Sequence, residues 1–311
     1  MRRTVSYLTA TVVLVSLLAG TGWLALARTE GGKALDASKI GQAAGTKATT
    51  APDGVVRLAW ARTDVPVKID GMTWKPFGGL GSWAAFTATA HGAMAMGDTV
   101  VFQDEVTPAI DTAFANGLDV TALHNHFFFD EPKVYFMHIG GSGDPEKLAA
   151  AVKSIWDAIK QVRAKQATPA TQFTGAMPKD GKLNAAELDK VFGTKNEGQD
   201  GVVKYTIARK GKMHGVEVGG SMGLTTWAAF AGSDESAAVA GDFIMAGPEV
   251  QTVLKTLRKH NLHIVALHNH MIGEEPVYYF VHFWGKGPAR ELAQGLRAAL
   301  DAQHSVPGKG H

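Results

Sequence analysis

Short runs rich in β-branched and aromatic residues alternate along this 311-residue chain with stretches whose apolar residues recur every three to four positions. The first pattern is typical of strands and the second of amphipathic helices. In the first half of the chain, the strand pattern occurs at residues 83–89, 99–102, 120–129 and 134–139. The last two runs flank Asp130, Glu131 and Pro132, a turn-like composition, and are therefore expected to form a hairpin.

Two helices are predicted in the same half. The first covers residues 107–115, where Ile110 and Phe114 have helical spacing, and it ends before Asn116 and Gly117. The second begins after Asp144, a favourable N-cap residue. Its buried stripe is expected to consist of Leu148, Val152, Ile155, Trp156 and Ile159. This order predicts an α+β fold built from a ββαββα-like unit, with an antiparallel sheet and helices on one face.

The chain contains this unit twice. Three motifs recur 144 positions later: Trp-Ala-Ala-Phe at Trp83 and Trp227, Gly-Asp at Gly97 and Gly241, and Leu-His-Asn-His at Leu123 and Leu267. Such self-similarity indicates a tandem duplication. We define copy one as residues 34–163 and copy two as residues 182–304, with a linker at 164–181 and a tail at 305–311. We expect the sheets of the two copies to pack as a pseudo-twofold pair.

The N-terminus has the pattern of an export signal. Arg2 and Arg3 precede an apolar stretch from Val5 to Ala19, and the small-residue triplet at residues 25–27 offers a cleavage site. Residues 1–27 are therefore either a cleaved signal peptide or an N-terminal anchor, in which residues 5–27 remain in the membrane. Both alternatives predict an exported body, periplasmic or secreted, and an anchor would be its only membrane contact.

Composition removes several classes of function. The chain has no cysteine, which excludes disulfides, thiolate metal ligands, a cysteine nucleophile and lipidation at a cysteine. Lysine and arginine number 31 against 29 aspartates and glutamates, and Arg2 and Arg3 account for the excess. Without a basic block, nucleic acid is not an expected partner.

A repeated set of histidines is the candidate site. Alternate residues of a strand share a face, so His124 and His126 point the same way, and Glu131 follows at the turn. His138 reaches the same face if the residue numbers that pair across the hairpin have an even sum. Copy two repeats the set as His268, His270, Glu275 and His282. Three imidazoles and a carboxylate suit a divalent transition metal, zinc first and copper second.

A structural role is the alternative for these residues, because a histidine on a strand is usually a hydrogen-bonded rim or core residue. The two copies keep the histidines and the glutamate, whereas apolar neighbours differ, as Phe127 and Met271 do. This contrast favours a metal or ligand role. Arg62 and Arg209 also recur, and each is either a carboxylate- or phosphate-binding residue or an exposed residue at a strand end.

The Leu-His-Asn-His, Glu-Glu-Pro, Tyr-Phe and His-Phe-Trp-Gly run, with Gly-Leu-x-x-Trp-Ala-Ala-Phe upstream, resembles the LppY/LpqO family. The resemblance covers most of the chain after the export segment. It implies export and a doubled domain, and it implies no activity. The absence of cysteine differs from the lipoprotein members, and copy one has Asp130 and Gly140 where copy two has Glu274 and Trp284.

Three functions are compatible with these residues. The first is binding of a metal ion or a small molecule at one His/Glu site per copy. The second is a metal-dependent hydrolase or oxidoreductase in which Glu131 or Glu275 acts as general base. The third is an interaction module without metal, in which the histidines form a structural seam.

Overall fold

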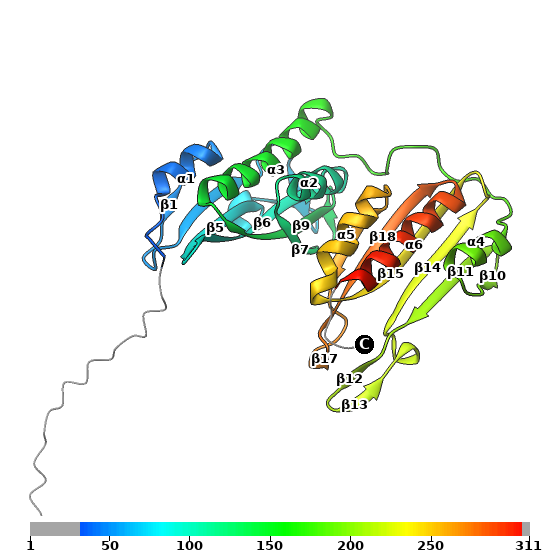
Figure 1. Cartoon of the computed structure of the whole chain (residues 1–311). Coiled ribbons are helices and arrows are strands. Elements are labelled where there is room, and N and C mark those ends of the chain that lie inside the picture. Colours follow the sequence, from blue (N-terminus) through cyan, green and yellow to red (C-terminus); the bar gives the residue numbers. More distant parts are fainter. Residues whose placement is uncertain (1–31, 307–311) are drawn as a thin grey trace, which may run out of the picture.

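The computed structural model describes residues 32–306 (Figure 1). The predicted export segment and the end of the tail lie outside these residues. Within the described part of the chain, no helix is both long and apolar enough to cross a membrane.

Copy one has a strand at each of the four predicted runs and both predicted helices, and it begins with additional elements. Its order is α1 (Ala37–Ala44), β1 (Thr49–Thr50), β2 (Val56–Ala61), β3 (Val67–Ile69), β4 (Met72–Trp74), β5 (Gly81–Thr89), β6 (Gly92–Phe102), α2 (Gln103–Ala115), β7 (Asp119–His124), β8 (Asp130–Glu131), β9 (Val134–Gly143) and α3 (Pro145–Lys165). The helix α1 and the strands β1 to β4 make the unit longer than ββαββα.

Copy two repeats this order. It consists of α4 (Ala185–Phe192), β10 (Glu197–Gln199), β11 (Val202–Ala208), β12 (Gly211–Met213), β13 (Val216–Val218), β14 (Thr225–Gly232), β15 (Ala237–Ala246), α5 (Val250–Lys259), β16 (His263–His268), β17 (Glu274–Glu275), β18 (Tyr278–Gly287) and α6 (Ala289–Ser305). Single 3₁₀ turns precede β5, β14 and α5. The chain is therefore a tandem duplication of a mixed unit of antiparallel strands and helices.

The two copies share one sheet, where two packed sheets were expected. Its twelve strands have the order β1-β2-β5-β6-β9-β7-β16-β18-β15-β14-β11-β10, so the second half mirrors the first. The strands β7 and β16 pair antiparallel, with Leu123 opposite Leu267. Because these two leucines are equivalent positions, their pairing places a local twofold axis between the copies. Strand alternation predicts each half of this sheet, but it does not show which edges meet.

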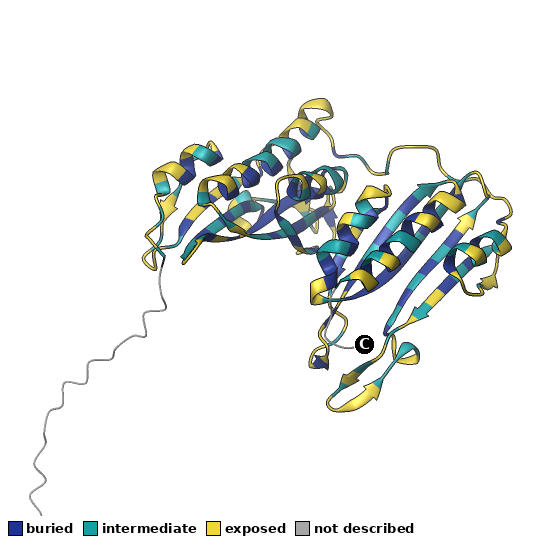
Figure 2. Ribbon diagram, viewed as in Figure 1, coloured by how far each residue is buried: buried dark blue, intermediate teal, exposed yellow. Residues whose placement is uncertain are grey.

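We call the pairing of β7 with β16, where the two copies meet, the join. Burial alternates along the strands that lie beside it (Figure 2). Leu123, Met137 and Ile139 are buried in the main core with apolar residues of α2 and α3. Their neighbours His124 and His138 point to the opposite face. On that face the side chains of Met94 and Met96 are exposed, so we call it the open face.

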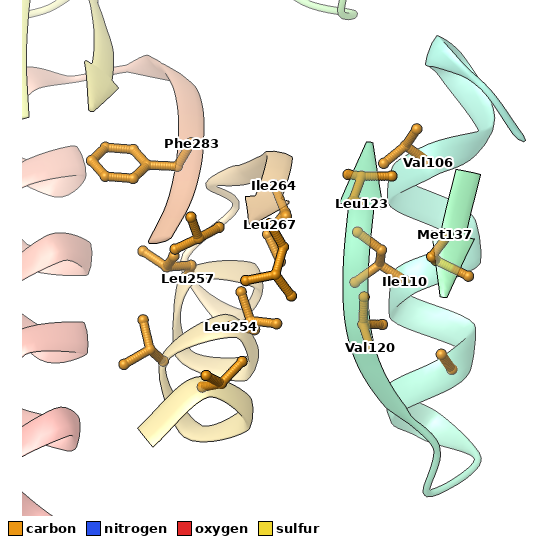
Figure 3. Close-up of a cluster of buried hydrophobic side chains, with 14 of the residues drawn as sticks. Val106, Ile110, Val120, Leu123, Met137, Leu254, Leu257, Ile264, Leu267 and Phe283 are labelled. Atoms are coloured by element: carbon orange, nitrogen blue, oxygen red, sulfur yellow. The ribbon is translucent and has the colours of Figure 1, made fainter. Parts of the chain in front are cut away.

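Apolar side chains of both copies fill the core at the join (Figure 3). Val106, Ile110, Val120, Leu123 and Met137 face it from copy one, and Leu254, Leu257, Ile264, Leu267 and Phe283 from copy two. Leu123 and Leu267 are at most 1% exposed, and burial of each stabilises the fold by roughly 1.5–3 kcal/mol. Since this core belongs to both copies, the two halves are expected to unfold together.

Polar contacts complete the join. Arg258 binds both carboxylate oxygens of Asp111, at 2.8 and 3.0 Å. The side chain of Gln251 accepts from the amide of Val120 and donates to its carbonyl, at 3.2 and 2.8 Å. Gln251 thus hydrogen-bonds the backbone of β7 at Val120, a residue that does not pair with β16.

The join also contains His263, which gives stability a pH dependence. Its Nδ1 lies 2.9 Å from the hydroxyl of Thr107, and burial, together with Arg258, lowers its pKa from 6.5 to about 4. Between these values the folded protein binds fewer protons than the unfolded chain, so the free energy of unfolding falls as pH drops through this window. We expect His263 to account for a loss of about 2 kcal/mol between pH 7 and pH 4.5. Denaturant unfolding of wild type and His263→Gln at both pH values measures it, and equal losses in the two proteins would contradict the assignment.

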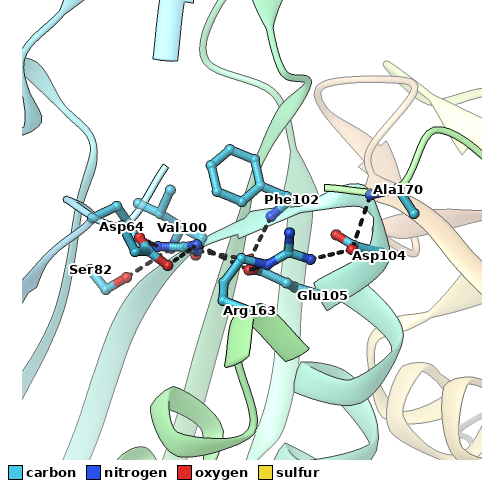
Figure 4. A network of polar contacts seen from close by, with 9 residues as sticks. Asp64, Ser82, Val100, Phe102, Asp104, Glu105, Arg163 and Ala170 are labelled. Carbon is cyan, nitrogen blue, oxygen red and sulfur yellow. Dashed lines mark hydrogen bonds and ion pairs between the residues drawn. The ribbon is translucent and has the colours of Figure 1, made fainter. Parts of the chain in front are cut away.

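Arg62 is neither an exposed strand-end residue nor free to bind a ligand. It is 1% exposed, and its guanidinium donates to both oxygens of Glu105, at 2.8 and 3.0 Å, and to both oxygens of Asp64. Arg163 approaches Glu105 from α3, with Nε 2.7 Å from Oε1, and contacts Asp104 (Figure 4). The backbone amide of Phe102 donates to Glu105 at 2.8 Å. This network ties α2 and α3 to the sheet.

Copy two builds the same contact with fewer charges. Arg209 donates to both oxygens of Glu249, at 2.5 and 3.0 Å. The second donor to Glu249 is the neutral side chain of Gln303, at 2.7 Å, where Glu105 of copy one has the charged Arg163. The recurring arginines therefore bind the protein's own carboxylates.

Candidate metal sites

The structure brings three of the four predicted residues together in each copy. Nitrogen atoms of His124, His126 and His138 all lie within 4.8 Å of one another, and His268, His270 and His282 form the same arrangement. We call these groups triad one and triad two. The hairpin pairs His124 with Phe136 and Ala122 with His138, so the even sum required for a shared face is met.

The strand that carries the first histidine is shorter than predicted. β7 ends at His124, and residues 125–129 leave the sheet. Asn125 causes this turn, because its side-chain amide donates to the carbonyl of Phe127 at 2.9 Å. His126 is therefore a loop residue, and it returns to the site because its ring stacks on Phe136, with ring centroids 3.3 Å apart.

Copy two positions its second histidine in the same way. Asn269 donates to the carbonyl of Met271 at 2.8 Å, and His270 stacks on Phe280 with ring centroids 3.5 Å apart. In both copies a β-bulge lies just before the first histidine, at Thr121 and at Val265. Bulges of this kind re-aim side chains next to functional sites.

Hydrogen bonds leave a free lone pair on several imidazoles. Nδ1 of His124 lies 3.3 Å from the carbonyl oxygen of Asn125. Nδ1 of His268 lies 3.2 Å from the carbonyl oxygen of Asn269. His282 makes the same contact with the carbonyl of Gly241, at 3.2 Å. A carbonyl only accepts, so Nδ1 carries the proton in a neutral ring and Nε2 keeps its lone pair. Metal-binding histidines are oriented by this kind of hydrogen bond.

A buried aspartate accompanies each triad. On β6, Asp98 pairs directly with His138, and one of its oxygens lies 3.9 Å from Nε2 of that histidine. On β15, Asp242 lies 3.3 Å from Nε2 of His270. Each aspartate has one buried carboxylate oxygen, Oδ1, with no hydrogen-bond partner within the described residues. A buried, unsatisfied carboxylate oxygen beside three imidazoles is the arrangement that a bound cation would complete.

Charge also favours a cation over a proton at these positions. Burial, and the positive charges that His124 and His138 would carry, lower the pKa of His126 to about 4. Burial lowers the pKa of His270 likewise, against the opposing effect of Asp242. Burial raises the pKa of both aspartates, and the neighbouring histidines counteract this effect. The lowered pKa values favour the neutral rings of His126 and His270, which can donate a lone pair.

The predicted glutamates lie outside both triads. Glu131 is exposed on β8 and pairs with Lys68 of β3 in a small three-stranded sheet. Glu275 is exposed on β17 and pairs with Lys212 of β12 in the equivalent sheet. Both glutamates lie on short strands that belong to the small sheets and not to the main sheet. The simple hairpin predicted from the sequence does not include these short strands.

The aspartates were missed by sequence reasoning although a signal was present. The Gly-Asp pair at residues 97–98 recurs at residues 241–242, with the same offset as the histidines. Only the strand order β6-β9-β7 places Asp98 beside His138.

A duplicated α+β unit with one histidine triad per copy is thus the class of protein that the fold and site define. The chain belongs to the family described as Domain of Unknown Function (DUF1259), which matches residues 38–158 and again residues 186–302. A comparison with curated proteins gives no match.

Solved structures offer only remote similarity. The trimeric bacterial microcompartment shell protein PduB is 9% identical over 82% of this chain and 89% of its own, with a TM-score of 0.19. The ethanolamine utilization protein EutL from Leptotrichia buccalis C-1013-b is 11% identical over 69% and 82%, with a TM-score of 0.19. The double ringed trimeric shell protein MSM0271 is 9% identical over 82% and 97%, with a TM-score of 0.21. At such TM-scores the likeness carries no argument about this chain.

Proposed function

We propose that this protein is an exported metal-binding protein of the LppY/LpqO family that holds one divalent transition ion in each copy. The observation that carries the proposal is the repetition of one geometry: two triads, equivalent residue by residue, each with imidazole nitrogens within 4.8 Å. The proposal of export rests on the sequence of residues 1–27.

The donor set favours zinc first and copper second. Three imidazoles match the protein ligands of open zinc sites, and copper also accepts imidazole. Asp98 and Asp242 would supply a carboxylate, either directly or by orienting a histidine. His126 and His270 are exposed, so an ion held there would keep a position open to a small molecule.

An enzymatic role is the second candidate, and one observation favours it: a cavity adjoins triad two. In a metal-dependent hydrolase or oxidoreductase, Glu131 or Glu275 would act as general base only if it turned from its small sheet toward the imidazoles. The third candidate, a metal-free histidine seam, has less support because both triads lie on the open face, away from the core of the join.

The metal content of the full chain tests the proposal. Protein purified without a tag would be incubated with zinc, copper, nickel, iron or manganese, desalted, and measured by elemental mass spectrometry. We expect one ion per copy, with zinc or copper retained best. If the protein retained none of these ions, a metal-binding function would be excluded.

A further inference from the structure

An open cavity of about 390 Å³ lies beside His268 and is lined by residues of both copies. Copy two contributes Ile272, Val277 and Tyr279 from the segment that follows the histidine loop, and copy one contributes Thr121 and Ala122 from β7. The cavity has the size of a small-molecule site.

The shared sheet explains why copy one reaches this cavity. Leu123 pairs with Leu267, so in the antiparallel register Ala122 lies opposite His268. Thr121 is at the bulge of β7, and its methyl group lies 3.6 Å from the point where a Cβ of Gly140 would stand, so the side chain lies on the open face. A molecule beside triad two would therefore contact both copies.

The lining of this cavity is amphipathic. Ile272 is 87% exposed, Val277 54% and Tyr279 36%, so apolar surface faces solvent at one side of it. His268 and Asn269 are the polar neighbours among its lining residues. Large apolar side chains that remain exposed around a polar centre are typical of a ligand-binding site.

Copy one does not repeat this lining. It has Phe128 where copy two has Ile272, Phe129 where copy two has Gly273, and Lys133 where copy two has Val277. Lys133 forms an ion pair with Asp130, at 2.9 Å, and so places a charge where copy two has an apolar side chain. The two triads match while their surroundings differ, and the exposed Phe128 and Phe129 give copy one apolar surface of a different shape. The two sites are therefore expected to select different molecules.

We propose that copy two binds a small amphiphile, with a carboxylate head on the metal at triad two and an apolar chain along Ile272 and Val277. This inference rests on the proposed metal function. The carboxylate head follows from the open position of a cation held by three histidines, and the apolar chain follows from the exposed side chains beyond it. Each buried methylene of the chain is expected to strengthen binding by about fourfold.

Calorimetric titration of the zinc-loaded full chain with octanoate and with acetate tests this inference. We expect octanoate to bind at least tenfold more tightly than acetate. Thr121→Trp and Val277→Trp, which narrow the cavity from copy one and copy two, should each weaken octanoate binding at least tenfold. Val265 is the copy-two equivalent of Thr121, and Lys133 is the copy-one equivalent of Val277. Val265→Trp and Lys133→Trp should leave octanoate binding unchanged. All four variants should keep their metal content.

The outcomes separate this inference from the proposed function. Equal affinity for acetate and octanoate in protein that retains its metal would overturn the amphiphile site alone. Equal weakening by the cavity variants and by their matched controls would also overturn it, because binding would then lie elsewhere. A wild-type protein that retains no metal would refute the proposed function itself.

Discussion

Replacing His124 and His126 together by alanine is expected to abolish metal binding in copy one and to leave the ion of copy two in place. Each triad draws its nitrogens from a single copy, so the loss should be confined to one site. Elemental mass spectrometry of the variant should therefore show half of the wild-type metal content. His268→Ala/His270→Ala should give the reciprocal result, and the combined variant should bind none.

The buried aspartates permit a graded version of this experiment. Asp242→Asn preserves the shape of the side chain but removes the charge beside His270. Loss of a charged group that orients or joins a metal ligand costs about 10- to 100-fold in affinity. A competition titration with a chelator should show this weakening in copy two, and Asp98→Asn should show it in copy one. If either double-histidine variant lost both ions, or neither, independent sites would be ruled out.

The second large effect concerns stability. Arg62→Met is expected to lower the free energy of unfolding by about 3 kcal/mol, because it removes two charge-assisted hydrogen bonds from the buried carboxylate of Glu105. Glu105 is fully buried, and in the variant its remaining charged partner would be Arg163. Denaturant unfolding of metal-free wild type and variant measures the change, so that bound metal does not contribute.

Copy two supplies the matched control for this measurement. Arg209→Met removes the equivalent arginine, but that side chain is 17% exposed and Gln303 continues to donate to Glu249. Water and an amide can then solvate the carboxylate, so the loss should be smaller than in copy one. Equal losses, or a smaller loss for Arg62→Met, would contradict the role assigned to burial.

The histidine triads could be predicted from the sequence because their geometry is mostly local. His124 and His126 are two residues apart, and His138 follows on the strand that returns beside them. The end of β7 at His124 was not predictable from alternation, since the apolar residues 127–129 continue a strand-like pattern. The deciding interaction is a single side-chain hydrogen bond from Asn125.

The parts that sequence reasoning missed depend on contacts between distant segments. Asp98 reaches the site through a strand that is 40 residues from His138 along the chain. The carboxylate that Arg62 binds belongs to Glu105, 43 positions away. From the sequence, an arginine that binds such an internal carboxylate looks the same as one that binds a ligand. The continuous sheet depends on which strand each copy leaves unpaired at its edge. The edge strand is set by the fold of the whole unit, so no single segment of the sequence predicts it.

The β7–β16 pairing has a consequence for the behaviour of the protein in concentrated solution. A single unit of this type would carry β7 or β16 as an unpaired edge strand with apolar neighbours, the kind of edge that recruits other chains into aggregates. Carrying two units on one chain pairs part of each edge with the other, at Leu123 and Leu267. The edges that remain in the main sheet are β1, with two residues, and β10, with three, and every residue in both is exposed. Such short, polar ends give another chain little to extend, so duplication guards this large sheet against growth.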